Sequence, residues 1–446
     1  MELSGKNVLV VGLARSGVAA LRLLSAKGAR LRVIDSASGD VLGERLEIAQ
    51  SLAEEVAVGR SEPGWYTDAD LIVVSPGVPL ARPDFQRAAD KGVPIVSEVE
   101  LASWFIDIPI VGITGTNGKS TVTALVGHLL RSSGKRPFVG GNFGRPLSEL
   151  PMTDETFDVA VVELSSFQLE AIDRMHPIAV AVTNLSFDHQ DRYNDFASYV
   201  RAKKNVFRNM TGENTAVLNY DNTASRENLT DLPCRTRWFS VDSSDAQVRL
   251  LGDEIHIDAD GSDLEIDVSG FPLHGRHNKE NLLAAVALAQ LAGAKTADMA
   301  EAIASFSGLP HRLERLGDVG GVRFVNDSKA TSPDAVSTAL ESLDGPLILL
   351  LGGKDKGGNF RSLIELMEQK VKLVVTFGEA SELIASQLTD LGHVVPTLTL
   401  EDAFATAVGE AKDGDTILLS PGCASQDAYT NFEHRGDHFR ELAHAL

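Results

Sequence analysis

The chain has 446 residues, with 62 acidic against 41 basic side chains and a formal net charge of −21. This length exceeds what one hydrophobic core usually supports, so two or three domains are expected. The negative charge argues against nucleic acid as a partner, because binding to it needs Lys and Arg to displace phosphate counterions. Small anionic ligands stay compatible with the composition, since a few local donors suffice to capture them.

The sequence indicates a cytoplasmic enzyme without a membrane partner. Its longest apolar runs are strand-sized, and residues 1–6 lead into a strand pattern instead of a secretion signal. The two cysteines, Cys234 and Cys423, make no disulfide framework and suit a reducing compartment. Nothing in the pattern requires more than a monomer.

Strand-like runs alternate with helical patterns along most of the chain, which is typical of α/β proteins with parallel sheets. In the first region, strands are predicted at residues 8–11, 31–34 and 71–74, with a helix through residue 24. In the second, they are predicted at 110–113, 159–162, 178–182 and 216–218. An antiparallel patch at 238–268, with turns at 252–253 and 260–261, precedes helices at 279–291 and 296–304. Strands in the third region are predicted at 323–325, 347–351, 373–377 and 416–419.

This order predicts three α/β domains, each a mainly parallel sheet with flanking helices. We expect a Rossmann-like domain at residues 1–97. A P-loop ATPase-like domain with the small antiparallel patch would follow at 98–309, and a second Rossmann-like domain would occupy 310–446.

The first glycine turn carries a variant of the dinucleotide fingerprint. Gly12, Ala14 and Gly17 form G-x-A-x-x-G after the first strand, and Asp35 ends the next one. A helix N-terminus with close backbone approach binds a diphosphate well. Many such turns serve only packing, and we favour a diphosphate of some kind over a nicotinamide cofactor. Asp35 or Ser36 would then face a nucleoside.

A second loop is a stronger signal. Residues 112–121 read Gly-Ile-Thr-Gly-Thr-Asn-Gly-Lys-Ser-Thr between a predicted strand and a predicted helix. Backbone N–H groups of such a loop surround phosphates, Lys119 would neutralise them, and Ser120 would ligate Mg²⁺. The spacing from Gly112 to Gly118 is one residue longer than the strict Walker pattern. The sequence therefore predicts an ATP site.

Two acidic residues and a histidine are predicted near this loop. Glu163 ends one strand, and Asp188-His189 follow another. Ligands of parallel sheets gather at the carboxyl ends of the strands, where a carboxylate can hold Mg²⁺.

These motifs resemble the Mur ligases, a family related to folylpolyglutamate synthetase. The similarity rests on residues 115–120, Glu163, His189 and the segment His277-Asn278-Lys279-Glu280-Asn281, and it extends over nearly the whole chain. Segments 163–169, 188–193 and 420–433 resemble the members that add D-glutamate. Those members often have an arginine after the second strand, where this chain has Ala37; Arg15 is the candidate replacement.

The resemblance implies roles for individual residues. Lys203 matches a lysine that becomes carbamylated and helps to hold Mg²⁺. The catalytic candidates are Lys119, Glu163, His189 and Lys203, and the metal ligands are Ser120, Glu163, His189 and Lys203. The ATP candidates are Gly115, Thr116, Asn117, Gly118, Lys119, Ser120, Thr121, Asn278, Asn281, Arg312 and Asp327. The precursor candidates are Gly12, Arg15, Ser16, Asp35, Ser36, Ser75, Gly77 and Asn142. The D-glutamate candidates are Lys329, Thr331, Lys356, Ser425 and Phe432.

The implied activity is ATP-dependent joining of D-glutamate to UDP-N-acetylmuramoyl-L-alanine, through an acyl phosphate, in peptidoglycan precursor synthesis. A folylpolyglutamate-type ligase or another Mur ligase is the nearest alternative. The hypothesis of a nicotinamide oxidoreductase rests on the first glycine turn and gives the second loop no function. A regulatory protein that holds ATP without ligase chemistry is the remaining alternative.

Overall fold

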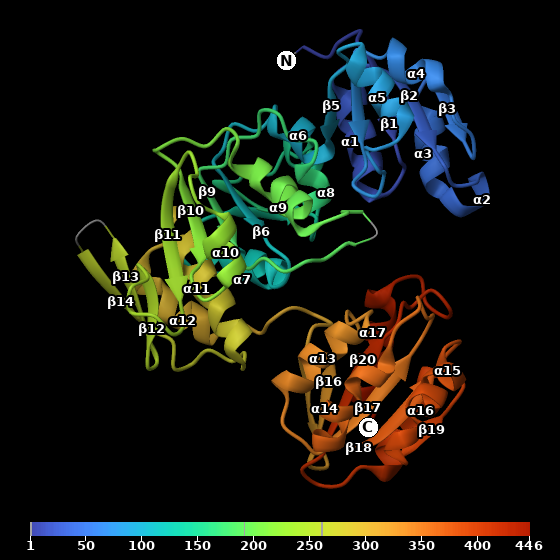
Figure 1. Ribbon diagram of the computed structural model, residues 1–446, viewed down its shortest axis with the longest axis vertical. Helices are drawn as coiled ribbons and strands as arrows, with labels where there is room; N and C mark the ends of the chain where they lie inside the picture. Colours follow the sequence, from blue (N-terminus) through green and yellow to red (C-terminus); the bar gives the residue numbers. More distant parts are fainter. Residues whose placement is uncertain (1, 191, 260–261) are drawn as a thin grey trace. The chain divides into compact units, whose positions relative to one another are not determined.

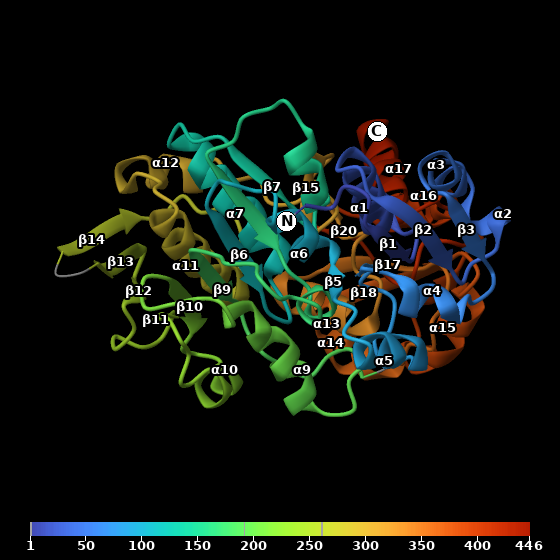
Figure 2. The ribbon, with the colours of Figure 1, turned by 90° about the horizontal axis from the view of Figure 1, so that it is seen from above.

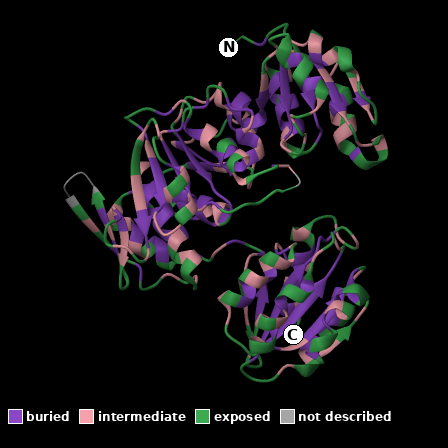
Figure 3. Ribbon diagram, viewed as in Figure 1, coloured by how far each residue is buried: buried purple, intermediate pink, exposed green. Residues whose placement is uncertain are grey.

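The computed structural model describes residues 2–190, 192–259 and 262–446. The chain divides into two compact units, residues 1–306 and 307–446. Within the described part, two sheets belong to the first unit and one to the second (Figure 1). Most strands of these sheets are buried, while the helices expose one face (Figure 3). No described helix is both long and apolar enough to cross a bilayer.

The first sheet has the order β3-β2-β1-β4-β5, and its paired strands are all parallel. The order reverses at β1, and ligands of such sheets bind in the crevice at the carboxyl ends of the strands there. The strands are β1 (Asn7–Val11), β2 (Arg30–Asp35), β3 (Glu55–Val58), β4 (Leu71–Val74) and β5 (Ile95–Ser97). The helices are α1 (Arg15–Ala26), α2 (Gly39–Leu42), α3 (Glu44–Leu52), α4 (Pro63–Asp68) and α5 (Pro83–Asp90), followed by α6 (Glu98–Ser103).

The second sheet has the order β14-β13-β12-β11-β10-β9-β6-β8-β7. It is parallel from β7 to β12, and β12 to β14 pair antiparallel. Its strands are β6 (Ile110–Thr114), β7 (Pro137–Gly141), β8 (Val159–Glu163), β9 (Ala179–Val182), β10 (Thr215–Asn219), β11 (Arg235–Ser240), β12 (Val248–Leu251), β13 (Glu254–Ala259) and β14 (Ser262–Asp267). Its helical segments are α7 (Lys119–Ser132), η1 (Leu147–Met152), α8 (Ser166–Leu169), α9 (Phe196–Lys204), η2 (Asn205–Phe207), α10 (Thr223–Asn228), α11 (Arg276–Leu291), η3 (Thr296–Asp298) and α12 (Met299–Ala304).

The helices α7 and α11, which lie far apart in the sequence, pack against each other and against this sheet (Figure 2). Residues 282–289 of α11 are all buried. They consist of Leu, Ala and Val, because a helix enclosed between a sheet and a second helix has no face left for polar side chains.

The second unit holds the sheet β15-β16-β20-β17-β18-β19, in which β15 is antiparallel to β16 and the other pairs are parallel. Its strands are β15 (Glu314–Val319), β16 (Val322–Asn326), β17 (Leu347–Gly352), β18 (Val371–Phe377), β19 (Val394–Pro396) and β20 (Thr416–Gly422). Its helical segments are α13 (Pro333–Ser342), η4 (Phe360–Leu363), α14 (Ile364–Lys370), α15 (Ser381–Gln387), η5 (Thr389–Leu391), α16 (Leu400–Glu410) and α17 (Phe432–His444).

The predicted α/β class with mainly parallel sheets and flanking helices is confirmed, and each strand predicted outside the patch is present. The patch begins later than predicted: β11 pairs parallel with β10, and antiparallel pairing starts between β12 and β13. The prediction missed β7, whose sequence contains Pro137, Gly140 and Gly141, residues that normally mark turns. The predicted turn at residues 260–261 lies outside the described residues, and the domain boundaries at 97 and 309 stay predictions.

Candidate active site

A glycine-rich loop joins β6 to α7. Gly115 (φ +137°) and Gly118 (φ +83°) have backbone conformations that other residues rarely adopt. A Cβ at Gly115 would lie 2.0 Å from the Thr183 hydroxyl, and one at Gly118 would lie 2.1 Å from the Asn281 amide oxygen. The loop therefore needs both glycines, and it ends at the N-terminus of α7, where a phosphate is favoured.

Two residues after β9 fix this loop. The Thr183 hydroxyl donates to the Asn117 carbonyl (2.5 Å). The Asn184 side-chain oxygen accepts from the Asn117 N–H (2.9 Å), and its carbonyl accepts from the Thr116 N–H (3.0 Å). Neither residue is among those predicted from the sequence. The available signal was their position directly after a predicted strand, at the sheet edge where Glu163 also lies.

Lys119, the first residue of α7, extends its amine back along the loop. Its Nζ donates to the carbonyls of Gly115 (3.1 Å) and Thr116 (2.7 Å). Ser120 and Thr121 follow it and are buried. Lys119, Ser120 and Thr121 thus lie in the first turn of α7, directly after the glycine-rich loop.

Lys203, on α9, reaches the same loop from a distant part of the sequence. Its side chain is buried, and its Nζ donates to the Gly115 carbonyl (2.7 Å) and approaches the Thr114 hydroxyl (3.4 Å). The Tyr199 ring lies 4.7 Å from the amine. Burial, together with the neighbouring Lys119 charge, lowers the pKa of Lys203 well below its usual value. Both effects shift the equilibrium toward the neutral amine, compared with an exposed lysine.

Glu163 ends β8 with a buried carboxylate. Its Oε1 accepts from the Asn142 amide (2.8 Å), whereas Oε2 is buried and meets no hydrogen-bond donor in the described structure. An unsatisfied buried carboxylate oxygen is unfavourable, and a divalent cation is a partner that would satisfy it. The described residues contain no group of three or more His, Cys, Asp or Glu arranged around a metal. Other side chains or substrate phosphates would have to complete such a site.

His189 lies on the loop after β9 with a left-handed backbone (φ +56°). Its ring packs against Phe167 in a tilted arrangement, with 4.6 Å between centroids, and its Nε2 lies 3.6 Å from a carboxylate oxygen of Asp188. The side chain is about half exposed (43%). The structure thus places this predicted metal ligand on an accessible loop, in contrast to the buried Glu163 and Lys203. Asp191, from the same motif, lies outside the described residues.

The predicted adenine residues stand at the start of α11. The Asn281 amide donates to the Asn278 side-chain oxygen (3.4 Å), and the Asn278 amide donates to the His274 carbonyl (2.8 Å). Asn281 is also the residue that a Cβ at Gly118 would strike. The fold therefore brings α11 directly to the phosphate loop.

The first-sheet residues meet at the carboxyl ends of β1, β2 and β4. The Ser75 hydroxyl donates to the Gly12 carbonyl (2.8 Å). The Asp35 carboxylate accepts from the N–H groups of Leu13 (2.6 Å) and Ala37 (2.7 Å). Gly12, Asp35 and Ser75 are thus held in one network. One carboxylate oxygen of Asp35 binds the loop after β1 at Leu13 and the other binds the loop after β2 at Ala37, so this residue connects the two loops.

Arg45 is a residue that the sequence analysis missed. It lies on α3, and its guanidinium donates to the carbonyls of Leu13 (3.3 Å), Leu42 (3.1 Å) and Val41 (2.8 Å). It therefore sits beside the first loop, while Arg15, the predicted cation, is exposed at the start of α1. No motif marks Arg45, because an isolated arginine on a short helix reads as a surface charge.

The remaining candidates belong to the second unit. Asp327 is buried after β16, where its carboxylate accepts from the Leu313 N–H (3.2 Å) and the Ser420 hydroxyl (2.8 Å). Burial raises the pKa of this carboxyl to about 7. The Lys329 amine lies 5.7 Å from the centroid of the Phe432 ring. The other candidates occupy loops of the same unit: Arg312, Thr331, Lys356 and Ser425.

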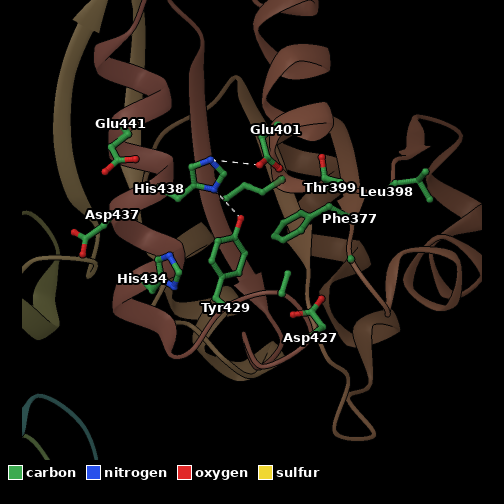
Figure 4. Close-up of a pocket in the computed structure, with 13 residues that line it drawn as sticks. Phe377, Leu398, Thr399, Glu401, Asp427, Tyr429, His434, Asp437, His438 and Glu441 are labelled. Carbon is green, nitrogen blue, oxygen red and sulfur yellow. Dashed lines mark hydrogen bonds and ion pairs between the residues drawn. The ribbon is translucent and has the colours of Figure 1, made fainter.

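A cavity of about 430 Å³ also opens in the second unit, between α16 and α17 (Figure 4). There the His438 ring bonds to the Tyr429 hydroxyl (2.8 Å) and lies 3.4 Å from the Glu401 carboxylate. None of the predicted substrate residues lines it. We therefore assign this cavity no part in the candidate site.

Comparison with known proteins identifies the regions one by one. The Mur ligase MurD-like N-terminal domain matches residues 6–97, the Mur ligase middle domain matches residues 113–289, and the Mur ligase glutamate ligase domain matches residues 311–423. The chain is 40% identical over 449 residues to the UDP-N-acetylmuramoylalanine–D-glutamate ligase of Desulfatibacillum aliphaticivorans, covering all of both chains. It is 40% identical over 447 residues to the enzyme of the same name from Geotalea daltonii, covering all of this chain and 99% of the relative.

Solved structures share the fold. The UDP-N-acetylmuramate-alanine ligase MurC of Thermotoga maritima aligns over 99% of both chains, with a TM-score of 0.60 and 20% identity. A pseudomurein peptide ligase type C of Methanothermus fervidus aligns over 99% of this chain and all of its own, with a TM-score of 0.59 and 18% identity.

Proposed function

Because the chain belongs to the Mur ligase family of ATP-dependent amide-bond ligases, we propose that it joins D-glutamate to UDP-N-acetylmuramoyl-L-alanine in peptidoglycan precursor synthesis. The observation that carries this proposal is the end-to-end 40% identity with ligases of that name. The MurD-like match over residues 6–97 favours a nucleotide-sugar over a nicotinamide at the first loop. We place the reaction in the cytoplasm, in a monomer that binds small molecules and no nucleic acid.

The reaction needs an activated carboxylate, since a carboxylate oxygen is a poor leaving group. The precursor carboxylate attacks the γ-phosphorus of ATP, ADP departs, and an acyl phosphate remains. The D-glutamate amine, after losing a proton, attacks the acyl carbon, and the tetrahedral intermediate then expels phosphate. Lys119 and the loop N–H groups hold the charge of the transferring phosphoryl group, mainly by position and electrostatics.

We propose that Ser120, Glu163, His189 and a carbamylated Lys203 hold Mg²⁺, which would neutralise phosphate charge. The free buried oxygen of Glu163 supports this assignment. The lowered pKa of Lys203 supports the carbamate, because only a neutral amine adds to CO₂, forming an N–C bond and releasing a proton. The amine also faces a carbonyl oxygen of the phosphate loop, so a carbamate there would lie beside the phosphates.

The substrate residues are assigned by region. Asn278, Asn281, Arg312 and Asp327 would bind ATP together with residues 115–121: the two asparagines near adenine, Arg312 at the phosphates and Asp327 near the ribose. Gly12, Arg15, Ser16, Asp35, Ser36, Ser75, Gly77 and Asn142 would bind the precursor, and Arg45 is added to them for its position beside the first loop. Lys329, Thr331, Lys356, Ser425 and Phe432 would bind D-glutamate.

Phosphate release measured across acceptors and amino acids tests this proposal. We expect release that requires ATP, UDP-N-acetylmuramoyl-L-alanine and D-glutamate together. L-Glutamate should be turned over at least about 10-fold more slowly, because inverting the α-carbon leaves one carboxylate contact unpaired at ~1–3 kcal/mol. Faster turnover of L-glutamate, or acceptance of a folate in place of the muramoyl precursor, would favour the folylpolyglutamate-type alternative.

A further inference from the structure

Arg435, on α17, is the largest fully buried side chain of the described structure. A guanidinium has five N–H donors, and here each bond that it makes ends on a hydroxyl or a carbonyl. Nε donates to the Ser328 hydroxyl (3.0 Å), and Nη2 donates to the carbonyls of Ser328 (2.9 Å) and Cys423 (3.0 Å). Nη1 donates to the carbonyls of Gly352 (3.3 Å) and Ala424 (3.2 Å). All five donor positions are thus used.

These acceptors come from three separate loops. Ser328 follows β16, Gly352 ends β17, and the Cys423 and Ala424 carbonyls follow β20. The three strands are neighbours in the order β16-β20-β17. One planar cation therefore connects three adjacent strand ends, at the sheet edge where ligands of parallel sheets bind.

The same loops carry the residues assigned to D-glutamate. Ser328 precedes Lys329, and Ala424 precedes Ser425. The Ser328 hydroxyl, which accepts from Arg435, itself donates to the carbonyl of Phe432 (2.8 Å). A change in the position of the guanidinium would thus reach those pocket residues through a hydrogen bond to Ser328 or Ala424 and one further covalent or hydrogen bond.

Arg435 makes no direct ion pair among the described residues, since all its hydrogen bonds end on neutral groups; the Asp427 carboxylate acts on it only electrostatically and raises its pKa. Burial lowers its pKa to about 10, which leaves it a cation at neutral pH. Burying an unpaired charge is unfavourable, and an apolar side chain of similar volume would avoid that penalty. A positive charge enclosed at this edge favours an anionic ligand, and D-glutamate brings two carboxylates.

We propose that Arg435 is a positioning residue that sets the spacing of the three loops around the amino-acid substrate and supplies positive potential for its carboxylates. This inference rests on the proposed D-glutamate activity. It adds a residue that touches no substrate atom and acts through Ser328, Ala424 and Phe432.

Arg435→Lys tests the inference, with Arg440→Lys as the matched control. Lysine keeps the charge but has three donors and no planar fork, so some carbonyls lose their partner. We expect the KM for D-glutamate to rise at least 10-fold and kcat/KM to fall on the order of 10²-fold. The KM values for ATP and the muramoyl precursor should change by less than about 2-fold. Arg440, on the same helix, pairs with Glu314 (2.9 Å), and its lysine variant should leave all three KM values within about 2-fold.

A purely structural role predicts a different result. Equal changes in all three KM values, or a lower melting temperature with an unchanged KM for D-glutamate, would overturn the inference. Should Arg435→Lys fail to fold, Ser328→Ala removes one acceptor and the bond to Phe432, and we expect a smaller rise confined to the KM for D-glutamate. An unchanged value in that variant would also overturn it. Failure of the proposed function shows separately, as absent D-glutamate turnover by the unmodified chain.

Discussion

Lys203 in the first unit and Arg435 in the second are both buried basic side chains whose hydrogen bonds end on neutral oxygens instead of carboxylates. Burial lowers the pKa of each. The consequences differ, because an amine can lose its proton at physiological pH whereas a guanidinium keeps it. The first unit thus gains a nucleophilic amine beside the phosphate loop, and the second gains a permanent charge that fixes three loops.

Similar packing thus serves reaction chemistry at Lys203 and loop geometry at Arg435. At Lys203, the nearby Lys119 charge adds to desolvation and favours the neutral form. At Arg435, five hydrogen bonds satisfy every donor, so the guanidinium stays charged and is held in one orientation. Removing the first side chain should therefore abolish chemistry, and altering the second should change substrate binding.

Lys203→Ala gives the largest expected effect and tests the first half of the comparison. Turnover should fall by 10²-fold or more, on the order of what is lost when a charge-stabilising group is removed. Added formate or acetate should restore part of the activity by occupying the space of the carbamate. Steady-state phosphate release, measured with and without the short acids, provides the check.

Lys204→Ala is the matched control for that experiment. Lys204 neighbours Lys203 on α9, and its amine donates to the Asn228 carbonyl (3.2 Å), away from the phosphate loop. Its loss should reduce turnover by less than about 3-fold, as for a partly exposed surface contact. Near-normal activity in Lys203→Ala, or carboxylate rescue confined to the Lys204 variant, would show that the carbamate is assigned to the wrong residue.

A pair of glycine variants tests a related proposal, in which the first unit binds the two nucleotides at separate loops. Gly118→Ala forces a side chain at φ +83° against Asn281, and Gly12→Ala forces one at φ +94° to 2.8 Å from Ser75 Cβ. Each strained position costs ~1–3 kcal/mol. We expect Gly118→Ala to raise the KM for ATP about 10-fold and Gly12→Ala to raise that for the muramoyl precursor to a similar extent.

Each variant serves as the control for the other, because the KM of the second nucleotide should stay within about 2-fold. The measurement is the full set of KM values for both variants. A loss of ATP affinity in Gly12→Ala would reverse the assignment of the two loops.

The parts of the site that the sequence predicted are the local ones. A strand, a glycine loop, a lysine and a helix within ten residues identify the phosphate loop, because each element is a neighbour of the next. The contact of Lys203 with Gly115 joins residues 88 positions apart, and family resemblance alone supplied that candidate. Thr183 and Asn184 are marked in the sequence only by their position after a predicted strand. Main-chain carbonyls are present at every residue, so the four carbonyls that accept from Arg435 leave no pattern in the sequence.

Arg435 shows the limit most clearly. It stands in the sequence Phe-Glu-His-Arg-Gly-Asp-His-Phe, where alternating charges indicate a solvated helix. Only the docking of α17 against the ends of β16, β17 and β20 buries it. The charge pattern of a helix therefore predicts that its charged side chains are exposed only where no loop carbonyls converge on that helix.

A final expected effect is on stability instead of turnover and concerns two buried carboxyls of the described structure: Glu98 in the first unit and Asp327 in the second, where burial raises the pKa of each to about 7. A glutamate ionises near pH ~4.3 in an unfolded chain. Between that pH and about 7, the folded state keeps a proton that the unfolded state has released. The free energy of unfolding therefore falls as pH rises through this window, and this group adds no pH dependence above or below it.

Glu98→Gln should flatten that decline in the first unit, by on the order of 3 kcal/mol between its ends. The three tryptophans, Trp65, Trp104 and Trp238, all lie in residues 1–306, so urea unfolding followed by tryptophan fluorescence at pH 4.5 and 7.5 reports on this unit. The Ser148 N–H that donates to Glu98 Oε1 (2.6 Å) keeps its acceptor in the amide variant. Asp327→Asn, whose effect falls in the second unit, should leave the tryptophan transition with the pH dependence of the unmodified chain. An unaltered slope in Glu98→Gln would mean that this carboxylate is already ionised below neutral pH, and burial alone would then not set its protonation.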